Sequence, residues 1–422
     1  MLLSHPHVSP RLWRNALFVV FALTGAGQAA WITRTPSIRA ALDLTVGEMG
    51  WIIFGISVGS VAGLLVASRV VARWGGRTGM LAGAICIGAG LIAAGAGTEL
   101  ALGWLAFIGL SITGAGFGLL EVALNVEGAA LERHVGRTCL PAIHAAFSIG
   151  TLVGSGLGAG AVFAGTPVLL HLGMTGALVI AGTAAAVRLV AAGTGVEPRS
   201  PKATGSASGR VKVWREPRTM ILGVVVMGMA FAEGAGNDWI PLALVDGYGI
   251  SEFHASLGFA VYAGLMTLVR MLGARLVARF GRRQTLQGLG LFAAAGLLLV
   301  IFGSTPALAM VGVGLWGAGV ALGFPLGLSA AGDDPNGTAA RVSAVATAGY
   351  IAFLVGPPVL GLLGDHNGIR SALLIVLAGV AVAIGFSQST RPISSAPAPA
   401  GPNQDTLTPE RTALRQGDNA ND

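Results

Sequence analysis

The chain has 422 residues, of which 53% are hydrophobic and only 11% are charged, and its mean hydropathy is +0.74. Soluble domains carry about 25% charged residues, so these apolar side chains cannot all be buried in one globular core. The net charge of +7 is better explained by basic loops beside a membrane than by a nucleic-acid-binding surface. The composition therefore excludes a soluble domain and predicts an all-α polytopic membrane protein.

Twelve apolar runs are long enough to cross a bilayer as helices, which takes about 20 residues each. They cover residues 15–34, 50–70, 78–97, 101–124, 140–163, 168–190, 219–241, 254–276, 284–303, 306–330, 342–363 and 369–388. An even number of spans puts both termini on one side. That side receives 22 of the 26 Lys and Arg residues, the other side receives Arg34, Arg39 and Arg370, and Arg270 falls inside a run, so we expect both termini to be cytoplasmic.

Two hydrophilic segments divide the chain. Residues 192–217 are rich in Pro, Ser, Gly and basic residues, which is typical of a cytoplasmic linker. Residues 389–422 lack apolar periodicity, which predicts a disordered cytoplasmic tail. The expected organisation is a cytoplasmic N-terminus at 1–14 and six-helix bundles at 15–191 and 218–388, joined by the linker and followed by the tail.

The two predicted bundles repeat short stretches in the same order. SRVVARWGGR (68–77) returns as ARLVARFGRR (274–283), GAGQAAWI (25–32) as GAGNDWI (234–240), and LVG at 152–154 as LVG at 354–356. The separations stay between 202 and 209 residues. A tandem repeat of six helices with the same topology is the arrangement of one large class of secondary transporters.

The repeated basic turn resembles the loop signature of the major facilitator superfamily, G-x-x-x-D-R-x-G-R-[RK], between helices two and three and again between eight and nine. The matching gating-loop positions are Arg73, Gly75, Arg77, Arg279, Gly281 and Arg283. The signature's Asp is replaced by Ala72 and Ala278. The resemblance implies the twelve-helix major facilitator fold, whereas the missing Asp questions the latch that this Asp forms in the family.

Further stretches are similar to the fucose permease branch and its uncharacterised bacterial inner-membrane relatives. They are FALTGAG (21–27), WITRTPSIRAAL (31–42), LLEVALN (119–125), HAAFSIG (144–150) and AEGAGNDW (232–239). The resemblance implies a proton-coupled sugar symporter in which the glutamate of the LLEVALN stretch, Glu121, couples protons. The branch's aspartate on the first helix is Ile32 here, which weakens fucose specificity.

Two acidic residues inside predicted spans are candidates for proton coupling. Glu121 has Phe324 as its counterpart in the other half, and Glu233 has Thr24, so neither carboxyl belongs to the repeated scaffold. A carboxyl group in lipid is costly unless it is paired or titrates, which makes it a functional candidate. The alternative for Glu121 is a position near the cytoplasmic helix end, where it meets water or Arg133.

Candidate substrate-binding residues are polar side chains within or beside the spans: Gln28, Asn125, His144, Asn237, Asp238 and Arg270. Amides can donate and accept hydrogen bonds with a polyol. Arg270 can be the counter-charge of Glu233 or Glu121, bind an anion, or extend to the headgroups. Trp31 and Trp239 recur in both halves and favour an interfacial aromatic belt.

The predicted function is secondary active transport, most simply proton-coupled symport of a small polar metabolite that resembles a sugar or cyclitol. The alternatives are a proton-driven efflux antiporter and a non-transporting receptor or scaffold on the same fold. No P-loop, paired metal ligands or catalytic order of Ser, His and Asp is found, so we expect neither enzyme activity nor a cofactor or metal. The expected partners are the substrate, protons and lipid, with no nucleic acid, and the chain is expected to be a monomer.

Overall fold

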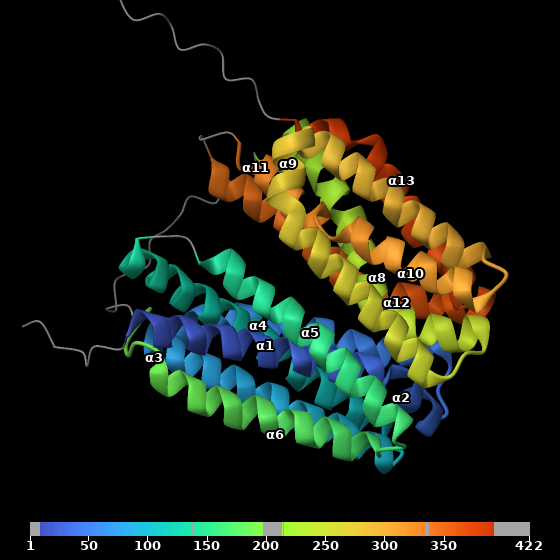
Figure 1. Cartoon of the computed structure of the whole chain (residues 1–422), viewed down its shortest axis with the longest axis horizontal. Coiled ribbons are helices and arrows are strands. Elements are labelled where there is room, and N and C mark those ends of the chain that lie inside the picture. Colours follow the sequence, from blue (N-terminus) through green and yellow to red (C-terminus); the bar gives the residue numbers. More distant parts are fainter. Residues whose placement is uncertain (1–8, 137–138, 197–212, 214, 334–336, 392–422) are drawn as a thin grey trace, which may run out of the picture. The chain divides into compact units, whose positions relative to one another are not determined.

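The computed structural model describes residues 9–136, 139–196, 213, 215–333 and 337–391 (Figure 1). The predicted tail beyond residue 391, most of the predicted linker and the first eight residues lie outside these ranges. All the regular elements within them are helices. This agrees with the all-α fold predicted from composition.

The helices form two sets, which we call the N-half and the C-half. The N-half contains α1 (Pro10–Thr33), α2 (Thr35–Ala41), α3 (Val46–Glu99), α4 (Gly103–Val135), α5 (Leu140–Phe163), α6 (Val168–Ala186) and the 3-10 helix η1 (Val187–Leu189). The C-half contains α8 (Pro217–Tyr248), α9 (Glu252–Phe302), α10 (Pro306–Val320), α11 (Gly323–Ala331), α12 (Thr338–Asn367), α13 (Ile369–Gly385) and the 3-10 helix η2 (Ser387–Thr390).

Helices α3 and α9 are each two helices joined at a sharp turn. Gly75 (φ 82°, ψ 167°) and Gly281 (φ 76°, ψ 161°) take backbone angles that residues with a side chain rarely adopt. Nine helices of the described chain are long and apolar enough to span a membrane, and Ile369–Gly385 is a shorter apolar helix. With α3 and α9 each crossing twice, the described residues make twelve crossings, as the sequence predicts.

The fourth and tenth predicted runs both contain Gly-Ala-Gly, at residues 114–116 and 317–319, and these glycines mark close helix contacts. A Cβ atom on Gly114 would lie 2.1 Å from the carbonyl oxygen of Ile56, so α4 touches the backbone of α3. A Cβ atom on Gly317 would lie 2.3 Å from the carbonyl oxygen of Tyr262, so α10 touches α9 in the same way. Small residues let membrane helices pack backbone to backbone, which explains why both halves keep them.

Successive helices run in opposite directions, so the chain has two ends that the loops define. The basic end holds the Gly75 and Gly281 turns and the starts of α1 and α8. The far end holds α2, the starts of α3 and α9, and the end of α12. Helices α1 and α8 are the most enclosed spans, with 67% of each spanning window buried.

Hydrogen bonds and ion pairs join the two halves at the far end and near the middle of the spans. The Gly47 N–H donates to Asp365 Oδ1 at 2.8 Å, and the Thr45 hydroxyl donates to Asp365 Oδ2 at 3.1 Å. Further contacts are the ion pair of Arg39 with Asp246 and the hydrogen bonds from Ser37 to Glu252, from Ser256 to the Thr33 carbonyl, and from Ser57 to the Phe353 carbonyl. These contacts hold the far ends of the halves together.

Candidate functional site

Three predicted residues of the N-half form one hydrogen-bonded set. The Asn125 amide donates to Glu121 Oε1 at 2.9 Å, and Asn125 Oδ1 lies 3.1 Å from His144 Nε2. Asn125 and Glu121 are four residues apart on α4, so they share a helix face. Because Asn125 Oδ1 is an acceptor in this arrangement, the His144 proton must be on Nε2.

This set faces the C-half. The Glu121 carboxyl and the Tyr350 hydroxyl on α12 are close enough to interact electrostatically. The side chain of Glu121 is exposed, and so is that of His144, whose ring lies 4.7 Å from the Phe21 ring on α1. The set is therefore a polar surface of α4 and α5 that faces α12 across the interface of the halves.

The second predicted pair lies in the C-half. Arg270 Nη2 lies 2.6 Å from Glu233 Oε1, and Arg270 Nε donates to the carbonyl oxygen of Ala321 at 3.1 Å. The Tyr262 hydroxyl donates to the backbone carbonyl of Glu233 at 3.0 Å. Arg270 is thus the counter-charge of Glu233 in this structure, which is one of the roles that the sequence left open.

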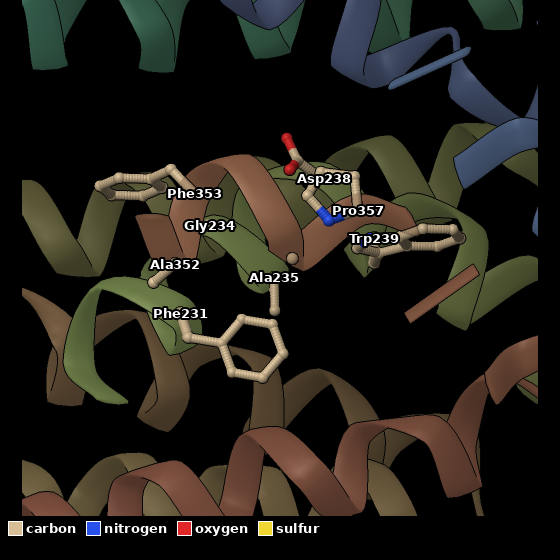
Figure 2. A pocket seen from close by; sticks show the side chains of 9 residues that line it. Phe231, Gly234, Ala235, Asp238, Trp239, Ala352, Phe353 and Pro357 are labelled. Carbon is tan, nitrogen blue, oxygen red and sulfur yellow. The ribbon is translucent and has the colours of Figure 1, made fainter. Parts of the chain in front are cut away.

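Asp238 borders a small hollow between α8 and α12. The other lining residues are Phe231, Gly234, Ala235, Trp239, Ala352, Phe353, Gly356 and Pro357. In Figure 2 the Asp238 carboxylate points away from the Phe231 ring and toward the helices of the N-half. Asp238 makes no hydrogen bond or ion pair with any residue that the structure describes.

Gln28 and Asn237, the two remaining binding candidates, lie on α1 and α8 and are partly buried. Neither side chain is hydrogen-bonded to another described residue, so both amides have free donors and acceptors. The structure does not bring them into the Glu121 set.

The interfacial-belt interpretation of Trp31 and Trp239 is wrong. The two rings are 1% and 0% exposed, because they lie on the enclosed helices α1 and α8. Their indole N–H groups are buried without a hydrogen-bond acceptor among the described residues. The sequence repeat therefore marks core positions here, whereas a belt residue would contact headgroups and water.

The gating-loop residues are divided between the two turns at the basic end. Arg77 Nε donates to the carbonyl oxygen of Val190 at 2.6 Å, which ties the first turn to the end of the N-half. Arg73 lies over the Trp74 ring and Arg279 over the Phe280 ring. Arg283 has a buried Nε without an acceptor among the described residues.

Sequence reasoning missed Glu127, a fully buried carboxyl group on α4. It packs against the first turn, where a Cβ on Gly76 would lie 2.3 Å from Glu127 Oε1. The carboxylate faces Thr194, Trp13 and Arg77 without an aligned hydrogen bond. The sequence did show an acidic residue two positions after Asn125, which could have made Glu127 a candidate. Only the fold shows that its side chain points away from the interface of the halves.

A buried cation at the far end was also missed. The Arg34 side chain donates to His171 Nδ1 at 3.2 Å and to the Thr166 carbonyl at 2.6 Å. Burial lowers the pKa of Arg34 from its ordinary value, and the nearby Glu252 carboxylate acts in the opposite direction. No local pattern could reveal this contact, because His171 is 137 residues away in the chain.

The site offers groups for proton transfer and hydrogen bonding. Among the described residues, no group of three or more His, Cys, Asp and Glu side chains is arranged to hold a metal ion. A carboxyl, an amide and an imidazole linked by hydrogen bonds can bind a hydroxylated ligand and can take up or release a proton.

Known proteins resemble this chain along most of its length. A relative from Yersinia pestis, an uncharacterised MFS-type transporter, is 29% identical over 375 residues, which is 87% of this chain and 94% of the relative. The nucleoside transporter NupG aligns with a TM-score of 0.68 and 17% identity, over 89% of this chain and 98% of NupG. The E. coli fucose:proton symporter FucP aligns with a TM-score of 0.60 and 17% identity, over 90% and 98%.

The sequence model of one family matches residues 16–350 and 239–417. At these identities the two solved structures show a shared fold, and the family model covers most of the chain. The twelve crossings, the repeated halves and the match together lead to one assignment: this chain belongs to the Major Facilitator Superfamily and is a secondary transporter, not an enzyme.

Proposed function

We propose that this transporter couples the movement of protons to the uptake of a small polar metabolite resembling a sugar or cyclitol. The observation that carries the proposal is the hydrogen-bonded set of Glu121, Asn125 and His144 on the interface between the halves. A carboxyl group there can bind a proton, and its amide neighbour can exchange the same hydrogen bonds with a ligand hydroxyl. Substrate and proton would then affect each other's binding.

The ligand would be held by groups from both halves. Gln28, Asn125 and His144 would act from the N-half, and Asn237, Asp238 and the Glu233–Arg270 pair from the C-half. The names of FucP and NupG mention fucose with a proton, and nucleosides. We take from them only that polyols and ribosyl compounds are the first ligands to test.

The proposed orientation puts the basic end on the cytoplasmic side of a bacterial inner membrane, because most Lys and Arg residues of the loops lie at that end. The far-end bonds between the halves then close the external side. Alternating access would require these bonds to break while the basic turns of the two halves, with Arg73, Arg77, Arg279 and Arg283, approach one another.

Thermal unfolding of the purified protein tests the substrate class. Sugars, cyclitols, nucleosides and apolar cations would be compared at pH 5.5 and pH 7.5. A ligand at 100 times its Kd stabilises the folded state by about 2.7 kcal/mol, so weak ligands are detectable. A polyol that raises the Tm more at acid pH, and does so less in Glu121→Gln, would support the proposal.

Two other results would replace it. Stabilisation by apolar cations alone would favour the proton-driven efflux antiporter. Specific binding without flux in proteoliposomes would favour a receptor on a transporter fold. If proton-coupled flux were unchanged in Glu121→Gln, the role given to Glu121 would be wrong.

A further inference from the structure

The surroundings of Asp238 contrast with those of the other acidic groups on the interface. Glu233 has Arg270 as an ion-pair partner at 2.6 Å, and Glu121 accepts a hydrogen bond from Asn125 at 2.9 Å. Asp238 has neither kind of partner among the described residues. The other residues that line the hollow are glycine, alanine, proline, phenylalanine and tryptophan, none of which carries a charge.

The charged and titratable groups near Asp238 do not neutralise it. Tyr262 on α9 interacts electrostatically with Asp238, Glu233 and Arg270. Glu233 and Arg270 form a pair whose charges cancel, and Tyr262 is neutral at ordinary pH. From α12, the residues that line the hollow are Ala352, Phe353, Gly356 and Pro357, none of which carries a charge.

An ionised carboxylate without a partner is costly in apolar surroundings, whereas the neutral acid is much less so. In Figure 2 the carboxylate points from the hollow toward the N-half, and no charged or hydrogen-bonding group of the described N-half residues pairs with it. The conformation with the far end closed therefore suits the protonated form. Deprotonation would favour any rearrangement that brings water or a donor to the carboxylate.

The hollow lies directly behind the contact that closes the far end. A Cβ on Gly50 of α3 would lie 2.8 Å from the carbonyl oxygen of Pro357 and 3.0 Å from Gly361 Cα. Pro357 thus contacts the N-half with its backbone while its ring lines the hollow. Phe353, also in the hollow, accepts the Ser57 hydrogen bond at 3.0 Å. The segment of α12 that packs on Asp238 is the segment that meets α3.

We propose that Asp238 is a second proton-binding group of the transport cycle, and that its protonation permits α12 to close on α3 at the far end. The inference rests on the proposed proton coupling and adds a residue and a step to it. Asp238 takes a proton from the external solution when the far ends are apart, and the neutral acid is then covered as α12 closes. Loss of that proton toward the basic end favours reopening of the far end.

The test measures closure without any substrate. Ser256 is 0% exposed at the far end, so Ser256→Cys, in a chain with Cys86→Ser and Cys139→Ser, reports opening through its reaction with an impermeant maleimide. Labelling from the external side would be followed between pH 5.5 and pH 8. Leu100→Cys, an exposed far-end position, gives the intrinsic effect of pH on the reagent.

The normalised labelling rate of the reporter should rise with pH by about fivefold or more, within the limit of about tenfold per pH unit for one proton. In Asp238→Asn the reporter should be labelled slowly and at a rate independent of pH. Asp238→Ser would be used instead if the Asp238→Asn protein does not insert into the membrane. Asp43→Asn, which removes an exposed far-end carboxyl group, should keep the full response.

An unchanged pH response in Asp238→Asn, or no response in the parent, would overturn the role of Asp238. The readout also separates this inference from the substrate proposal. A pH response that depends on Asp238 would support this inference even if no polyol were transported. Polyol-driven proton flux that survives Asp238→Asn would support the proposed function but would reject the proton-binding role of Asp238.

Discussion

Asp365 offers the most specific test of how the far end is closed. Its carboxylate accepts hydrogen bonds from the Gly47 N–H and the Thr45 hydroxyl, at the first turn of α3 in the other half. A carboxylate is favourable at a helix N-terminus and unfavourable in the last turn of its own helix, where Asp365 lies on α12. The unfavourable term is present whether the halves are together or apart, so only the contact with α3 biases the equilibrium.

Asp365→Ala removes that contact. A hydrogen bond to a charged group contributes about 1.5–3 kcal/mol when buried. Asp365 is exposed, so solvent reduces the net contribution of the two bonds to about 1–1.5 kcal/mol. At about 1.4 kcal/mol per factor of ten, the open population should rise about five- to tenfold.

External labelling of Ser256→Cys would report this change, with Asp43→Asn as the control for loss of an exposed carboxyl group at the same end. The expected result is faster labelling in Asp365→Ala and no change in the control. Equal rates in both would show that the Asp365 contact does not hold the halves together, and the reasoning about the α3 N-terminus would be refuted.

Two further predictions concern stability in detergent. Arg270→Gln should lower the Tm more than the double variant Arg270→Gln with Glu233→Gln, because the single change leaves a partly buried carboxylate without its cation. The two variants should differ in their free energy of unfolding by about 1–2 kcal/mol after solvent screening. Strictly additive effects would contradict the ion pair. Gly281→Ala should destabilise by about 1–3 kcal/mol through its φ of 76° alone, since no neighbour lies within 4 Å. Gly288→Ala, in open space on the same helix, should be neutral or stabilising by up to about 1 kcal/mol; similar losses in both would refute the backbone argument.

Much of the fold could be predicted because its causes are local. Apolar run length fixes the spans, and the basic turns recur because Gly75 and Gly281 must take a backbone geometry that other residues avoid. The glycine pair Gly114 and Gly317 recurs because both halves pack helix backbones together at that point. These signals survive in the sequence without knowledge of the partner helix.

The site was predictable only in part. Glu121 and Asn125 are four residues apart on one helix, so their contact follows from helix geometry, and the Glu233–Arg270 pair was one of the roles considered. The contact of Asp365 with Gly47 joins residues 318 positions apart in different halves, and it depends on which conformation the transporter adopts. No periodicity or spacing encodes such a contact.

The positions of Trp31 and Trp239 could not be predicted from the sequence for a related reason. A tryptophan near the end of a predicted span is typical of a membrane interface, but helix burial depends on which helix lies at the centre of the bundle. Helices α1 and α8 occupy that place, so Trp31 and Trp239 are core residues.

In the proposed transport cycle, proton and polyol move together and Glu121 is required. The direct measurement is proton entry into proteoliposomes, followed with an internal pH-sensitive dye, when a polyol identified by thermal unfolding is added outside without an imposed gradient. We expect acidification with the parent protein and none with Glu121→Gln, which should still exchange labelled for unlabelled polyol. Polyol entry without acidification, or equal acidification in Glu121→Gln, would contradict it.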